Sequence, residues 1–76
     1  MTDRLPRVSA ADAVRVLEKD GFYLVRQSGS HKIFKNADGR RATVPFHSRK
    51  ELHPKILKSI LRDADLTVEE FLELMK

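Results

Sequence analysis

The residues with the clearest chemical potential form one short stretch, Gly29-Ser30-His31, at a turn between two predicted strands. Four polar side chains flank it, namely Arg26, Gln27, Lys32 and Lys35. A histidine in a turn, beside a flexible glycine and among cations, is better suited to chemistry on a phosphate-bearing ligand than to packing in a core. The stretch therefore predicts a site for a phosphate-containing partner.

Cleavage of RNA is one reaction that such a histidine can support without a cofactor. The 2′-hydroxyl of the substrate attacks its own phosphate once a base removes its proton and an acid protonates the leaving oxygen. Nearby Arg26, Lys32 or Lys35 could stabilise the charge that builds on the phosphorane oxygens. Spacing alone leaves the alternative open, because exposed histidines are more often polar surface residues or hydrogen-bonding turn residues.

Other chemistries find less support in the sequence. The chain has no cysteine, which excludes a disulfide framework, a thiolate zinc site and a cysteine nucleophile. The histidines His31, His47 and His53 lack the helical i, i+4 spacing of metal ligands, and we expect neither a metal nor a small-molecule cofactor. Its three glycines are scattered, so no phosphate-binding loop is predicted. Ser30 and His31 are neighbours that would point to opposite faces, and they form no catalytic dyad.

Charge is distributed unevenly along the chain. Residues 26–62 hold ten lysines and arginines against two acids, whereas residues 63–76 hold five acids and one lysine. A basic middle segment is typical of a protein that binds a polyanion, most often nucleic acid, although lysine-rich surfaces also serve solubility alone. No stretch approaches the roughly 20 apolar residues of a membrane span, and the first residues do not resemble a signal peptide. We therefore expect a soluble, cytoplasmic protein without a membrane partner.

Three helices are predicted from capping residues and apolar spacing. Ser9 can cap a first helix that ends at Asp20-Gly21, Pro54 suits the start of a second, and Thr67 with Glu70 forms a capping box for a short last helix. Their apolar faces should be buried, and these faces comprise Ala10, Ala13, Val14, Leu17, Ile56, Leu57, Ile60, Leu61, Ala64, Phe71, Leu72 and Met75.

Three strands are expected between the first two helices. They lie at residues 22–27, 32–35 and 41–44, with turns at 28–30 and 36–39. Of the aromatic residues Phe22, Tyr23 and Phe34 most should be buried, because a small sheet needs aromatics for its core, although aromatics can also stack on bases. Alternation groups His31 with Ile33 and Lys32 with Phe34, and it does not settle which face meets the helices.

These elements predict an α+β fold in a single domain over residues 1–76. Their order is αβββα with a further terminal helix. A three-stranded antiparallel sheet would carry the helices on one face and leave its other face and the hairpin turns free.

At the same residues the chain resembles the HicA toxins, a family of mRNA interferases. The resemblance extends from about the first helix to the end of the chain. Its most specific part is the Gly-Ser-His core, and the matching segments are Gly21-Phe22, Val25 to His31 with Ile33-Phe34, Asp38 to Arg41, Val44-Pro45 with His47, Lys50 to Leu52, Leu57 to Leu61 and Glu69 to Phe71. One departure is Lys55-Ile56 after the proline of the second helix, where the family often has Gly-Thr.

This resemblance implies a double-stranded-RNA-binding-like fold, ribonuclease activity on mRNA and neutralisation by a HicB-type antitoxin. The catalytic histidine of the family maps to His31. We expect the basic segment and the turn to contact RNA through Arg26, Gly29, Ser30, Lys32, Lys35, Arg40, Arg41 and His47, and His47 could be a second acid or base. Two alternatives are a non-catalytic RNA-binding module and a protein-interaction domain that uses the unpaired sheet edge and the acidic last helix.

Overall fold

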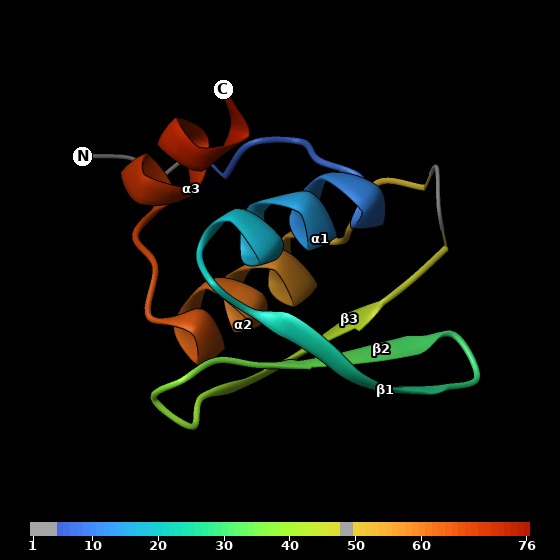
Figure 1. Cartoon of the computed structure of the whole chain (residues 1–76). Helices are drawn as coiled ribbons and strands as arrows, with labels where there is room; N and C mark the ends of the chain where they lie inside the picture. The colour runs from blue at the N-terminus through green and yellow to red at the C-terminus, as the bar shows by residue number, and fades with distance from the viewer. Residues whose placement is uncertain (1–4, 48–49) are drawn as a thin grey trace.

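The computed structural model describes residues 5–47 and 50–76, and its three helices all lie on one side of a three-stranded sheet (Figure 1). The predicted α+β class and the order αβββα(α) are confirmed. In chain order the elements are α1 (Ala10–Lys19), β1 (Tyr23–Ser28), β2 (His31–Lys35), β3 (Arg41–Pro45), α2 (Pro54–Ala64) and α3 (Val68–Met75).

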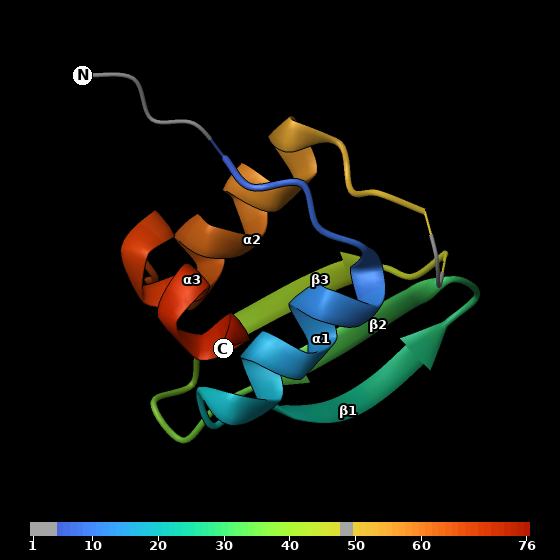
Figure 2. The ribbon, with the colours of Figure 1, turned by 90° about the horizontal axis from the view of Figure 1, so that it is seen from above.

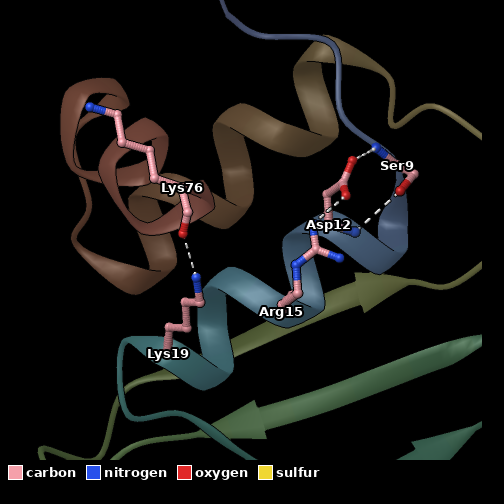
Figure 3. Close-up of polar contacts among 5 residues, drawn as sticks. All are labelled: Ser9, Asp12, Arg15, Lys19 and Lys76. Atoms are coloured by element: carbon pink, nitrogen blue, oxygen red, sulfur yellow. Dashed lines mark hydrogen bonds and ion pairs between the residues drawn. The ribbon is translucent and has the colours of Figure 1, made fainter.

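Local capping fixes where the helices begin, as the sequence predicted. At α1 the Ser9 hydroxyl accepts a hydrogen bond from the Asp12 backbone N–H, and the Asp12 carboxylate accepts one from the Ser9 N–H, both at 3.1 Å (Figure 3). Thr67 and Glu70 form the same reciprocal pair at α3. At α2 the Nδ1 atom of His53 accepts a hydrogen bond from the Lys55 N–H at 3.1 Å, so His53 is a capping residue.

The sheet is an antiparallel meander in the order β1-β2-β3. Strands β1 and β2 are joined by the two residues Gly29-Ser30, a shorter turn than predicted, because Ser28 still pairs with His31. Gly29 has a φ of 58°, the left-handed backbone that the first position of such a tight hairpin requires. His31 is therefore the first residue of a strand and not a turn residue.

Burial settles the question of which face of the sheet meets the helices. Phe34, Ala42 and Val44 are buried, and their positions share one face of β2 and β3. That face packs against α1 and α2, which lie over the sheet in Figure 2. Side chains alternate between the two faces along a strand, so His31 and Ile33 of β2 belong to the opposite face, which we call the open face.

Two apolar residues that the sequence placed on buried helix faces are exposed. Ile56 and Leu72 lie beside the buried stripes of α2 and α3, whose inward positions include Leu57 and Phe71, so their own positions point away. Tyr23 is 53% exposed, because it lies on the edge strand β1 and shares the open face with its register partner Lys35. Phe22 and Phe34 are buried, which confirms the prediction that most of these three aromatics are buried.

Candidate nucleic-acid interface and active site

The open face presents three rows of side chains across the strands. In an antiparallel sheet, register partners project from the same face, so each row follows from the strand pairing. From the Gly29-Ser30 end the rows are Ser28, His31 and Pro45, then Arg26, Ile33 and Thr43, then Tyr23, Lys35 and Arg41. The face thus combines a histidine, an aromatic ring and three cations without a covering helix.

His31 lies at one end of this face and is exposed. Its two lateral neighbours are Ser28 and Pro45. Backbone pairing continues beyond it, because the Phe46 N–H donates to the Ser30 carbonyl oxygen. The hairpin end that carries the imidazole is therefore held to both neighbouring strands while the side chain itself remains open to solvent.

Three of the predicted RNA-contacting cations share the open face with His31. Arg26 pairs with Ile33, which makes it a diagonal neighbour of His31 across β1 and β2. Lys35 and Arg41 pair with each other at the far end of the face. Lys35 lies four positions beyond His31 along β2, a distance of about 13 Å. Positive charge therefore extends along the face from the histidine.

Two other predicted cations are not on this face. Lys32 pairs with Val44 on the helix side, where its Nζ lies 4.0 Å from the centre of the Phe46 ring. Arg40 lies in the turn between β2 and β3 and donates to the Asp63 carbonyl oxygen at 3.0 Å, with the Asp65 carboxylate 3.8 Å away. Both side chains make intramolecular contacts that the local sequence did not indicate.

The remaining predicted contacts lie at the hairpin end of the sheet. Gly29 and Ser30 form the turn itself, and a Cβ added at Gly29 would have no heavy atom within 4 Å. His47 is exposed and lies two residues beyond Pro45, the register partner of His31. The structure therefore brings both histidines to the same end of the sheet.

Two residues of the open face were missed by the sequence interpretation. Ser28 was assigned to a turn, yet it lies beside His31; a two-residue turn at Gly29-Ser30 would have predicted that pairing. Tyr23 was named only as one of three aromatics of which most should be buried, and it lies on the open face with 53% exposure. No short-range signal distinguishes an aromatic on a covered strand from one on an uncovered strand.

The opposite side of the molecule has an acidic hollow of about 260 Å³ between the end of α1 and α3. Asp20, Glu70 and Glu73 line it together with Leu66 and Leu74. Burial raises the pKa of Asp20, and the neighbouring Glu70 carboxylate raises it further. Its negative charge repels phosphates, so this hollow does not fit a nucleic acid.

The described part of the chain shows neither a metal-ligand cluster nor a membrane-spanning helix. Within residues 5–47 and 50–76, no three histidine or acidic side chains gather in an arrangement that could hold a metal ion. In the same residues, no helix has both the length and the apolar character needed to cross a bilayer.

Comparison with known proteins identifies the family. No curated protein matches the chain. The family model described as the HicA toxin of bacterial toxin-antitoxin systems matches residues 10–66, which include α1, the whole sheet and α2. Since this match covers most of the chain and all three rows of the open face, the protein belongs to the HicA toxin family and is the toxin of a toxin–antitoxin pair.

Proposed function

We propose that this toxin is an endoribonuclease that cleaves mRNA and uses His31 as a general acid or base. The observation that supports this most strongly is the position of His31, exposed at the end of an open sheet face that also carries Arg26, Lys35 and Arg41. A phosphate drawn to this face by the cations comes within reach of an imidazole. The family assignment supports an RNA substrate.

The reaction requires only the substrate and proton transfers. His31 takes the proton of a ribose 2′-hydroxyl, whose oxygen then attacks the adjacent phosphorus. The bond from phosphorus to the 5′-oxygen breaks, and that oxygen receives a proton. The products are one strand with a 2′,3′-cyclic phosphate and one with a 5′-hydroxyl. Arg26, the cation diagonal to His31, stabilises the negative charge that builds on the phosphoryl oxygens.

His47 is the candidate for the second proton transfer. It lies at the same end of the sheet as His31 and is exposed. A base on one side of the phosphate and an acid on the other would divide the two transfers between two imidazoles. If His47 only contacts RNA, the leaving oxygen takes its proton from water.

The decisive experiment is incubation of the purified toxin with end-labelled mRNA in the presence of a chelator. We expect cleavage, and we expect the upstream fragments to end in a 2′,3′-cyclic phosphate. Replacing the ribose at one mapped cleavage position by deoxyribose should abolish cleavage there and leave the other positions unaffected. Cleavage that continues at the deoxyribose position would contradict attack by the 2′-hydroxyl.

A non-catalytic RNA-binding module is the second candidate. It is favoured by Lys35 and Arg41, which lie about 13 Å from His31 along the face and so contact phosphates other than the reacting one. This alternative predicts salt-sensitive binding of RNA with no new fragment ends. Intact RNA after prolonged incubation with stoichiometric toxin would favour it over the proposed nuclease.

The proposed partner is a HicB-type antitoxin that covers the open face. A toxin–antitoxin pair requires a protein that restrains the toxin, and the cations of the open face favour an acidic partner surface. Covering His31 would block access to the site directly.

A further inference from the structure

We propose that Tyr23 is a stacking platform for one base of single-stranded RNA that lies along the open face with its reacting phosphate at His31. The inference rests on the proposed nuclease function and adds to it a substrate conformation and a base-contacting residue. It predicts that the toxin reads an unpaired base at a fixed distance from the bond that it cleaves.

The position of Tyr23 is the first support. Its register partner is Lys35, which in turn pairs with Arg41, so the ring begins the far row of the open face. It is 53% exposed on an edge strand. A ring in one row with two cations that can hold phosphates is an arrangement by which proteins bind single strands, with bases on the aromatic and the backbone on the cations.

No cation of the described residues lies over the Tyr23 ring. The cation–π contact that the described residues make is between the Lys32 ammonium and the Phe46 ring, and it lies on the helix side of the sheet. More than half of Tyr23 therefore remains accessible to a ligand. Stacking requires a base outside a duplex, because the bases of a double helix already stack on one another.

A protein-binding patch explains the exposed tyrosine less well. Tyr23 is followed by two further exposed apolar residues, Leu24 and Val25. Leu24, however, pairs with the buried Phe34 and so projects from the helix side, while Tyr23 projects from the open face. Tyr23 and Leu24 thus project from different faces, and Tyr23 lies in one row with Lys35 and Arg41.

The distance along the sheet defines the register of the substrate. The row of Tyr23 and Lys35 lies about 13 Å from the row of His31. An extended single strand covers that span with a few nucleotides. The base on Tyr23 should therefore belong to a nucleotide near the scissile bond but not adjacent to it.

Fluorescence can test this contact directly, because Tyr23 is the only tyrosine and the chain has no tryptophan. Single-stranded 2′-O-methyl RNA lacks the attacking hydroxyl, so it binds without being cleaved. We expect its titration to quench the tyrosine emission of the unmodified toxin to saturation. A duplex of the same sequence should quench little. In a series of oligonucleotides that each carry one abasic site, only one position of that site should remove the quenching. This position should lie at a fixed distance from the cleavage site mapped on ordinary RNA.

Substitutions give an independent readout. Tyr23→Ala should weaken binding of the labelled single strand by about tenfold or more and raise KM for cleavage, with kcat within a fewfold of the parent. Tyr23→Phe keeps the ring and should retain the affinity. Leu24→Ala is the matched control, since it removes an equally exposed apolar side chain, 47% accessible, from the other face and should change the affinity less than twofold.

The outcomes separate this inference from the proposed function. If the toxin cleaves RNA through His31 while Tyr23→Ala binds and cleaves like the parent, the stacking role is wrong and the nuclease stands. Quenching by the antitoxin but by no oligonucleotide would also overturn the role and assign Tyr23 to a protein interface. If RNA quenches the emission as described and is never cleaved, the platform stands and the nuclease function fails.

Discussion

Ser28 and His31 are register partners across the first hairpin, and their side chains project next to each other from the open face of the sheet. Only Gly29 and Ser30 separate them, so a two-residue turn places a hydroxyl beside an imidazole. A phosphate bound at the end of the sheet can accept a hydrogen bond from Ser28 while His31 exchanges a proton with the sugar. The hairpin turn is thus a structural requirement of the proposed site.

Replacing His31 should remove the cleavage activity and leave the fold intact. His31→Ala should lower kcat by a factor of about 10² to 10⁴, the usual contribution of a general acid or base. Because the side chain is exposed, the thermal unfolding midpoint should stay close to that of the parent. Single-turnover cleavage of labelled mRNA and circular dichroism would measure the two quantities.

Ser28→Ala provides the comparison for that variant. It removes a hydrogen bond to substrate but no proton transfer, so its effect on kcat should be much smaller than that of His31→Ala. A His31→Ala variant that cleaves at the parent rate would remove His31 from the mechanism.

Binding of RNA should depend steeply on salt through the cations of the open face. Each phosphate contact that is lost should reduce the slope of log K against log salt by about 0.7 for a single strand. Arg41→Ala should therefore flatten the slope by about one contact, because Arg41 lies on the open face. Filter binding of 2′-O-methyl RNA at several salt concentrations would measure this.

Arg40→Ala is the matched control for the salt experiment. Arg40 is adjacent in sequence, but its guanidinium contacts the Asp63 carbonyl oxygen and Asp65 at the end of α2. Its removal should leave the salt slope unchanged and lower stability slightly. Equal slopes for Arg41→Ala and the parent protein would exclude Arg41 from phosphate binding.

Gly29 should tolerate asparagine better than alanine. Its φ of 58° disfavours most side chains by roughly 1–2 kcal/mol, while asparagine adopts this region more readily. No atom would obstruct a Cβ there, so backbone conformation alone should set the loss of stability. Urea unfolding of Gly29→Ala and Gly29→Asn would test the order, and an equal or reversed order would show that the turn relaxes to another geometry.

Acid should weaken the start of α1 through Asp12. The hydrogen bond from the Ser9 backbone N–H, aided by Arg15, lowers the pKa of Asp12 below its ordinary 3.8. Its charge therefore stabilises the fold above that pH and ceases to do so as the pH falls through the lowered value. Asp12→Asn should cost about 0.3–1 kcal/mol at neutral pH, and the difference should disappear in acid.

Asp20 offers a control of opposite sign. Burial, with Glu70 nearby, raises its pKa, so its ionisation opposes folding once the pH exceeds the ordinary value. Asp20→Asn should therefore raise the unfolding midpoint at neutral pH, with the gain vanishing in acid. Thermal melts of both variants between pH 3 and pH 7 should diverge in opposite directions from the parent.

Local signals predicted the elements, whereas the composition of the site depended on tertiary contacts. Ser9 and Thr67 act within one helical turn, so the helix starts could be read directly from the sequence. The inward face of β2 could not be read from the sequence. One face of this strand carries His31 and Ile33 and the other carries Lys32 and Phe34, so both faces mix polar and apolar residues. Only packing against the helices decides between them.

Lys32 illustrates this limit. From the sequence it is as close to His31 as any cation, yet strand alternation places it on the helix side, where it lies over Phe46. Arg40 is equally basic but contacts the end of α2. Proximity in sequence therefore overstated the number of cations around the histidine, and the strand register reduced the set to those on the open face.

The antitoxin should inhibit by covering the open face. Because Arg26, Lys35 and Arg41 give this face its charge, an acidic partner surface would compete directly with RNA for it. Lys35→Glu should weaken both RNA and antitoxin binding, whereas Lys58→Glu, an equal charge change at an exposed position of α2, should affect neither strongly.

Hydrogen exchange of the toxin–antitoxin complex would locate the contact, with protection expected from Gly29 through Lys35. RNA should not bind the complex, and added antitoxin should release bound 2′-O-methyl RNA in proportion to its concentration. Protection restricted to α3, with RNA still bound to the complex, would mean that inhibition acts at a distance from the site. In that case Lys35→Glu would weaken RNA binding alone, since the partner would not contact the open face.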